Sequence, residues 1–155
     1  MIPQLFIVVL LSLVACEQGE DPVMGPPWLE LGSGLSEFIP VSDGDPLPLV
    51  YGIQGGWHVD TAARLGGVEL DGAFLTYNAF DPDNDALLNY SYDAYLSEAL
   101  LQELDDGWLR LGDRVVFDVA SDDDILDRTI QIEVTLTDVA GDTWQDTRTV
   151  VVVAP

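Results

Sequence analysis

Residues 129–138 have the sequence TIQIEVTLTD, and this stretch decides the fold class. Aliphatic side chains stand at every second position from Ile130 to Leu136, and Gln, Glu or Thr fills the positions between them. Successive side chains of a β-strand point to opposite faces of a sheet, so a period of two indicates one buried face and one solvent-facing face. The stretch therefore predicts a half-buried strand.

Working outward, the same kind of pattern predicts further short strands along the chain. They are residues 37–41, 47–53, 57–63, 73–80, 88–94, 115–119 and 147–153. Gly, Asp, Asn and Pro separate them, as at residues 43–46, 81–85, 112–113 and 140–142. Seven or eight short strands at this spacing favour an all-β Greek-key sandwich of antiparallel sheets.

One segment has a helical pattern instead. Leucines at positions 96, 100, 101 and 104 would share one helical face, with Ser97 as the N-cap and Glu98 in the first turn. We expect one short helix over residues 97–104. Gly107 would stop the helix from continuing, and the chain would return to the sheet at Trp108.

The charge balance excludes some partners. The chain has 28 Asp and Glu residues against five Arg and no Lys, which gives a formal net charge of -23. A field of this sign repels nucleic acid and anionic lipid headgroups, so we expect neither as a direct partner. Bound or dissolved cations would reduce the repulsion among the carboxylates of the chain.

The N-terminus resembles the signal peptide of bacterial lipoproteins. An apolar run over residues 5–14 is too short for a membrane span and is typical of a secretory signal. It ends in Leu13-Val14-Ala15-Cys16, which is similar to a lipobox with a small residue before the cut. The resemblance implies a signal peptide at residues 1–15 and a diacylglycerol and an N-acyl chain on Cys16, the only cysteine. The alternative is a cysteine of the folded core.

Acylation would fix the location of the protein. Stable membrane attachment takes two or more acyl chains, at ~0.8 kcal/mol for each buried CH₂. The anchor would then make the lipid bilayer a partner and hold the chain in the cell envelope. By the sorting rule of enteric bacteria, Glu17 favours the outer membrane over the inner membrane. Residues 16–27 would be the acylated cysteine and a flexible tether, because they are rich in Glu, Gly, Asp and Pro, and residues 28–155 would form the β-sandwich domain.

A second resemblance concerns the fold. Residues 79–91, AFDPDNDALLNYS, look like the strand, D-P-D-x-D loop and strand of cadherin-like and other bacterial immunoglobulin-like domains, and residues 132–153 resemble their last hairpin. The resemblance implies an immunoglobulin-like sandwich with Ca²⁺ bound by Asp81, Asp83 and Asp85. Alternate carboxylates in a tight turn suit a hard cation. The alternative is that Asp, Asn and Pro simply form a solvated turn here.

Two further observations concern loops. Residues 52–58, GIQGGWH, are similar to a G-P-Q-G-G-aromatic-H turn of envelope lipoproteins of unassigned activity, with Ile53 in place of the proline. If the strands alternate in direction, the connections at residues 54–56, 81–85 and 121–127 lie at one end of the sandwich. That end would gather several aspartates: Asp81, Asp83, Asp85, Asp122, Asp123, Asp124 and Asp127.

The sequence predicts no catalytic residue. The single histidine, His58, has no second histidine or free thiol to complete a metal or catalytic site, and its alternation indicates an exposed or rim position on the face of Asp60 and Arg64. The chain has no G-x-S-x-G motif. The four tryptophans could stack on sugars, although Trp57 falls in an apolar alternation typical of a core.

We therefore expect an anchored envelope lipoprotein whose immunoglobulin-like sandwich is a binding or structural module and not an enzyme. Its partner would be an envelope protein or glycan, with Ca²⁺ as a stabilising ion. One alternative is a small carboxylate-dependent hydrolase of envelope glycans. Another is a subunit of an envelope complex, which would offer an unpaired edge strand at residues 47–53 or 150–153. An enzyme needs a concave site, whereas a module needs an exposed apolar or aromatic patch.

Overall fold

A computed structural model describes residues 25–155. The predicted signal peptide, Cys16 and tether residues 17–24 lie outside the described residues. In the part that is described, no helix is long and apolar enough to cross a membrane.

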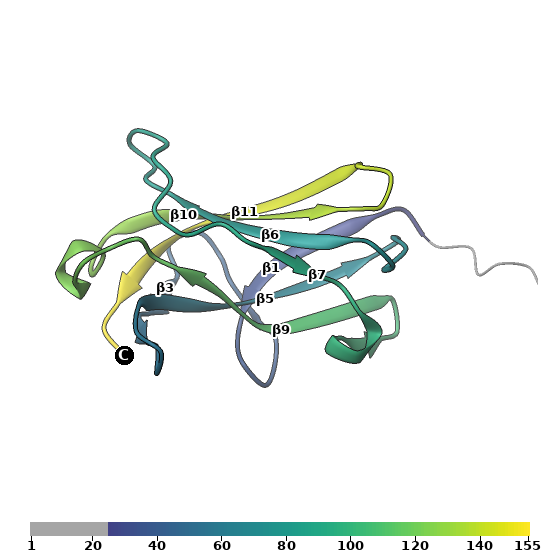
Figure 1. The fold of residues 1–155 in the computed structure, drawn as a ribbon, viewed down its shortest axis with the longest axis horizontal. Helices are drawn as coiled ribbons and strands as arrows, with labels where there is room; N and C mark the ends of the chain where they lie inside the picture. Colours follow the sequence, from purple (N-terminus) through teal and green to yellow (C-terminus); the bar gives the residue numbers. More distant parts are fainter. Residues whose placement is uncertain (1–24) are drawn as a thin grey trace, which may run out of the picture.

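Two β-sheets pack face to face, as the two layers of Figure 1 show. One sheet has the order β2-β1-β5-β9-β8, with β4 also paired to β5, and the other has the order β3-β11-β10-β6-β7. The strands are β1 (Trp28–Ser33), β2 (Ile39–Pro40), β3 (Pro46–Pro48), β4 (Val50–Tyr51), β5 (Trp57–Gly66), β6 (Phe74–Phe80), β7 (Asp93–Tyr95), β8 (Gln102–Leu104), β9 (Gly107–Val116), β10 (Thr129–Thr137) and β11 (Thr143–Val153). The predicted all-β sandwich is confirmed, although short additional strands raise the number above the predicted seven or eight.

Strand β10 lies in the middle of its sheet, between β6 and β11. Its four aliphatic side chains, from Ile130 to Leu136, are at most 1 % exposed, as the alternation predicts. They meet side chains of the opposite sheet, among them Val59 and Leu65 of β5 and Val115 of β9. Each fully buried aliphatic side chain contributes roughly 1.5–3 kcal/mol by leaving water, so this layer of side chains holds the two sheets together.

Residues 47–53 do not form the single strand that the sequence predicts. The chain changes sheets at Leu49, which is 1 % exposed, so that β3 pairs with β11 and β4 pairs with β5. The β3–β11 pair is parallel, in contrast to the antiparallel pairing that we expected. Burial of Leu49 between the sheets explains the crossing.

The predicted free edges are also different in the structure. Residues 151–153 of β11 pair with β3, so the expected unpaired edge at residues 150–153 is wrong. Strand β3 is an edge, but it has only three residues and two of them are prolines. Short edges with proline resist the addition of a further strand, because proline cannot donate a backbone hydrogen bond.

The predicted helix over residues 97–104 is wrong in its length. A single 3-10 turn spans Glu98–Leu100, with no side-chain cap from Ser97, and strand β8 follows directly. Helix nucleation is costly for so short a segment, whereas the open edge of β9 offers backbone hydrogen bonds to residues 102–104. The predicted return at Trp108 is confirmed, because β9 begins at Gly107.

Residues 112–113 form a bulge inside β9, where the sequence indicated a turn. Gly112 has a φ of 74°, and the register with β5 shifts opposite Thr61 and Ala62. Bulges re-aim the side chains beside them. Asp113, 5 % exposed, is here held by Arg110 through Nη2–Oδ1 (2.9 Å) and Nε–Oδ2 (3.1 Å) contacts.

This buried ion pair lies against the opposite sheet. Burial, and then the neighbouring carboxylate of Asp113, raise the pKa of Tyr77 in β6 well above its ordinary value. Tyr77 is fully buried. The ion pair of β9 and the Tyr77 hydroxyl group of β6 are therefore neighbours between the two sheets.

Residues 88–94, predicted as one strand, are mostly irregular: Asn89 forms an isolated bridge, and only Asp93 and Ala94 belong to a strand, β7. Asn89 is 5 % exposed, and its side chain accepts a hydrogen bond from the Ala79 backbone (2.7 Å) and donates one to the Tyr77 carbonyl (3.0 Å). Its backbone bridges to Phe117, which follows β9. The segment therefore closes the edges of both sheets before it enters β7.

Candidate functional site

The turn between β4 and β5 is the starting point of the site. Gly52 donates a backbone hydrogen bond to Gly56 (2.9 Å), and Gly55 donates one to Gly52 (2.9 Å). Gly55 and Gly56 have φ values of 88° and 92°, a region that side chains with a Cβ rarely adopt. The GIQGG sequence therefore folds into a tight turn, and Ile53 at its tip is fully exposed.

A groove of about 560 Å³ opens beside this turn, on the outer side of the sheet that contains β5 and β9. Its apolar walls include Tyr51, Ile53 and Leu35, of which Tyr51 is 61 % and Leu35 59 % exposed. We call this feature the Tyr51 groove. Tyr51 also packs on Trp57, with the ring centroids 4.8 Å apart. Large apolar side chains gathered around a concavity are typical of binding sites.

The polar side of the groove is formed by His58, Asp60 and Arg114. The Oδ1 atom of Asp60 lies 3.5 Å from Nε2 of His58 and 3.5 Å from Nε of Arg114. Asp60 and Arg114 are direct partners across β5 and β9. The Arg114 side chain is 54 % exposed, so its guanidinium group can also donate hydrogen bonds to a ligand in the groove.

His58 differs from the prediction that it is exposed or at a rim. It is 4 % exposed, because β5 is a central strand and the turn after β4 covers its outer side. The predicted proximity to Asp60 is confirmed. Burial lowers the pKa of His58; the charge of Arg114 acts in the same direction, whereas Asp60 opposes it. The ring is therefore neutral near pH 7, and its role here is to pack beside Asp60.

The predicted calcium loop forms a hydrogen-bonded turn. Asp81 accepts hydrogen bonds from the backbones of Asp83 (2.9 Å, at Oδ1) and Asp85 (2.9 Å, at its carbonyl). Its other carboxylate oxygen pairs with Arg128 at 2.7 Å. Asp83 and Asp85 are exposed. Within residues 25–155, no three His, Cys, Asp or Glu side chains form a group that could hold a metal ion. This geometry favours the turn alternative, and calcium binding stays a prediction.

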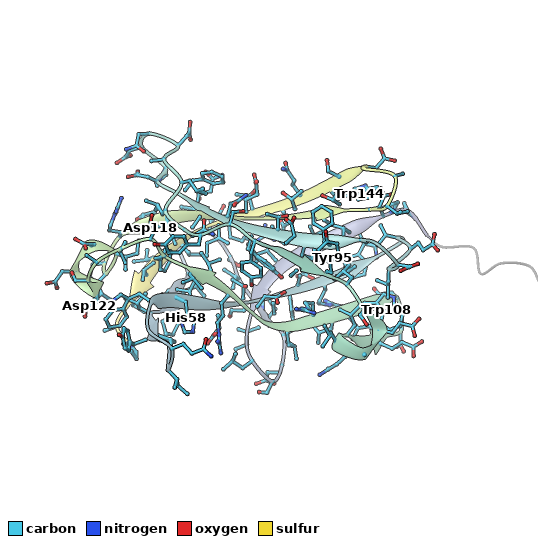
Figure 2. The ribbon with its side chains drawn as sticks, in the orientation of Figure 1. His58, Tyr95, Trp108, Asp118, Asp122 and Trp144 are labelled. Atoms are coloured by element: carbon cyan, nitrogen blue, oxygen red, sulfur yellow. The ribbon has the colours of Figure 1, made fainter. Side chains whose placement is uncertain are left out.

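The expected gathering of aspartate loops at one end is confirmed. Arg128 bonds Asp81 and also donates to the Asp124 carbonyl (3.2 Å), so the loop over residues 81–85 and the 3-10 turn Asp122–Asp124 are neighbours. Asp122 and His58 lie towards the same end of the molecule, opposite Trp108 and Trp144 (Figure 2). An arginine thus sits between the two acidic loops and reduces their repulsion.

The other arginines of the fold also pair with carboxylates. Each of the five arginines forms an ion pair with a carboxylate, and the pairs are Arg64–Glu30, Arg110–Asp113, Arg114–Asp60, Arg128–Asp81 and Arg148–Asp146. Arg148 also donates to the Val41 carbonyl (2.8 Å), while Asp146 accepts from the Leu31 backbone (2.7 Å). The few cations of this acidic chain therefore join its elements to one another.

Sequence reasoning did not find the Tyr51 groove. Tyr51 and Ile53 lay inside a segment predicted as one continuous strand, and Leu35 and Arg114 are distant from it in the chain. The signal that was present is the Gly55-Gly56 pair two residues after Ile53, because two glycines predict a tight turn and place Ile53 at its tip. The tryptophans considered as sugar platforms are all half-buried.

Comparison of the chain with protein-family models, with curated proteins and with solved structures gave no match in any of the three.

Proposed function

We propose that the protein is a lipid-anchored binding module of the cell envelope, and that the Tyr51 groove is its binding site. The observation that carries the proposal is the groove itself, in which exposed Tyr51, Ile53 and Leu35 surround a concavity with a charged side at Asp60 and Arg114. Folding alone gives no reason to keep these three apolar side chains in water. A partner that covers them would recover the free energy of burial, about 25 cal/mol for each Å².

The groove supports binding better than it supports hydrolysis. Glycoside hydrolysis usually requires two carboxyl groups on either side of the bond that is cleaved. Among the described residues that line the groove, Asp60 is the one carboxylate, and His58 and Arg114 hold it in place. The hydrolase alternative therefore has less support than the binding module.

The binding site can be tested with 8-anilinonaphthalene-1-sulfonate, whose rings suit the apolar walls and whose sulfonate suits Arg114. We expect saturable fluorescence enhancement with the domain, lost in Ile53→Asp and weakened about tenfold in Arg114→Gln, which corresponds to ~1.4 kcal/mol. Val139→Asp is the matched control, since Val139 is 68 % exposed and lies outside the groove. Equal dye binding by the Ile53 and Val139 variants would argue against the site.

The anchor needs a separate test, because Cys16 lies outside the described residues. In a bacterial host fed an alkyne fatty acid, we expect the full-length chain to take up the label and to sediment with membranes. Cys16→Ser should abolish both. Membrane sedimentation that persists in the unlabelled Cys16→Ser chain would contradict acyl anchoring.

A further inference from the structure

The outer side of the other sheet carries a second surface, separate from the groove. Cross-strand pairing places the outward residues of β6, β10 and β11 in continuous rows. They are Phe74, Thr76, Asn78 and Phe80 from β6, Thr129, Gln131, Glu133, Thr135 and Thr137 from β10, and Thr143, Gln145, Thr147, Thr149, Val151 and Val153 from β11. We call this surface the neutral face. Figure 1 shows β6, β10 and β11 in one layer of the sandwich, and β5 and β9 in the opposite layer.

Charge is nearly absent from the neutral face. Glu133 is its only ionisable residue, and Asp93 of β7 stands at the edge, where it accepts a hydrogen bond from Thr76 (2.7 Å). The whole chain nevertheless carries a net charge of -23. Hydroxyl and amide groups thus occupy a broad surface of a protein that is otherwise rich in carboxylates.

An apolar pair marks each end of β6 on this face. Phe74 lies opposite Tyr95, with ring centroids 5.5 Å apart and planes inclined by 50°. Phe80 lies opposite Leu87. Tyr95 is 63 % and Leu87 52 % exposed. The two phenylalanines are six positions apart in the sequence, which corresponds to ~20 Å along an extended strand.

Hydrogen-bonding groups lie between these two pairs. Thr76 and Asn78 stand on β6, next to Thr135 and Glu133 of β10. The side-chain oxygen of Asn78 has no hydrogen-bond partner within the described chain. Buried amide oxygens are rarely left unpaired, so this oxygen is an unsatisfied acceptor beneath the face.

From these observations we propose that the neutral face binds a neutral, linear glycan that lies along β6. Sugar hydroxyls both donate and accept, as the Thr, Asn and Gln side chains do. The apolar C–H faces of sugar rings suit exposed aromatic rings such as Tyr95. Interface cores of protein partners are enriched in Met and Arg as well as aromatic side chains, and the neutral face has aromatic side chains but neither Met nor Arg. The proposal is independent of the groove and of its ligand.

The probes are chitohexaose, cellohexaose and mannohexaose, each titrated into the folded domain by calorimetry, with a hexamer of galacturonic acid as the charged counterpart. We expect saturable binding of at least one neutral hexamer and none of the acidic one, because the field of the chain repels it. Tyr95→Ala should weaken the neutral hexamer about tenfold, or ~1.4 kcal/mol. Thr135→Val, which removes a hydroxyl and keeps the shape, should weaken it less. Leu100→Ala, at a residue 60 % exposed outside the face, should not change it.

Failure of all three neutral hexamers to bind the wild-type domain would overturn the proposal. So would binding that Tyr95→Ala and Thr135→Val leave intact, because the glycan would then lie elsewhere. Unfolding temperatures equal to that of the wild-type domain would show that weaker binding reflects the face and not the fold.

Discussion

The two outer faces of the sandwich differ in charge and in relief. The outer side of the sheet with β5 and β9 carries Asp60 and Arg114, and it is hollowed by a groove with exposed Tyr51 and Ile53. The outer side of the other sheet carries hydroxyls and amides, with an apolar pair at each end of β6. Both faces are built on a common core, so they can change independently as long as that core is intact.

The two surfaces differ in how strongly their shape depends on single backbone positions. The turn between β4 and β5 needs two glycines in an unusual conformation, so the shape of the groove depends on a few backbone positions. The neutral face needs only regular strand pairing, which the alternation of β10 and β11 supplies. We therefore expect single substitutions to remove the groove more easily than the neutral face.

The largest effect should come from the buried Arg110–Asp113 ion pair of β9, because it lies in the interior beneath both surfaces. Asp113→Ala leaves Arg110 buried without its partner, and breaking such a pair costs about 3–5 kcal/mol. We expect urea unfolding to show this loss and both binding activities to fall together. Asp105→Ala, at an exposed acidic residue before β9, is the control and should have little effect. A loss below about 1 kcal/mol for Asp113→Ala, as is usual for an exposed pair, would show that the pair contributes little to the stability of the fold.

Gly56→Ala should weaken binding in the Tyr51 groove and leave binding to the neutral face unchanged. An added Cβ has room, since its nearest neighbour is Val116 Cγ1 at 3.6 Å, but the φ of 92° is unfavourable for alanine. Strain of this kind costs of order 1–3 kcal/mol, so we expect loss of dye binding with unchanged glycan binding. Gly52→Ala, in the same turn without a positive φ, is the matched control. Equal effects of the two substitutions would mean that the turn conformation does not shape the groove.

A smaller effect concerns pH. Burial is the main cause that lowers the folded-state pKa of His58 below its ordinary value of 6.5. Below about pH 7 the unfolded chain therefore binds more protons at this ring than the folded chain, and the free energy of unfolding falls as the pH falls. In urea titrations from pH 7.5 to 5.5, His58→Gln should remove part of this slope. An unchanged slope in the variant would contradict the burial of His58 beside the groove.

The smallest effect should come from calcium. Arg128 already pairs with Asp81, and the carboxylates of Asp83 and Asp85 are exposed. We expect Ca²⁺ and Mg²⁺ at equal ionic strength to raise the melting temperature equally, through screening of the acidic surface. A rise specific to Ca²⁺, and lost in the Asp83→Asn, Asp85→Asn double variant, would restore the cadherin-like site and contradict this expectation.

How far the sequence could predict the molecule depended on the type of signal. Alternation predicted β10 and the sandwich, because the period of two reports directly which side chains are buried. It could not predict the change of sheets at Leu49, since an apolar residue between two sheets has the same local pattern as one within a strand. Gly112 was predicted to lie in a turn. In the structure it lies in a bulge, because β9 pairs with β5 on both sides of it.

The functional surfaces were harder to predict than the fold. The Tyr51 groove joins Leu35, Ile53 and Arg114, which the topology brings together from three separate segments. The neutral face requires knowledge of which strands are neighbours, because Phe74 meets Tyr95 and Phe80 meets Leu87 only through pairing. The polar residues of β10 were predicted to face solvent, but their partners on β6 and β11 were not.

The central claim is that one core carries two independent binding surfaces, and a crossed titration tests it most directly. Wild-type, Ile53→Asp and Tyr95→Ala domains would each be titrated with the naphthalene dye and with the neutral hexamer that binds the wild type. We predict that Ile53→Asp loses dye binding and keeps glycan binding, whereas Tyr95→Ala binds the glycan about tenfold more weakly and keeps dye binding. Loss of both ligands in either folded variant, or of neither in both, would contradict the claim.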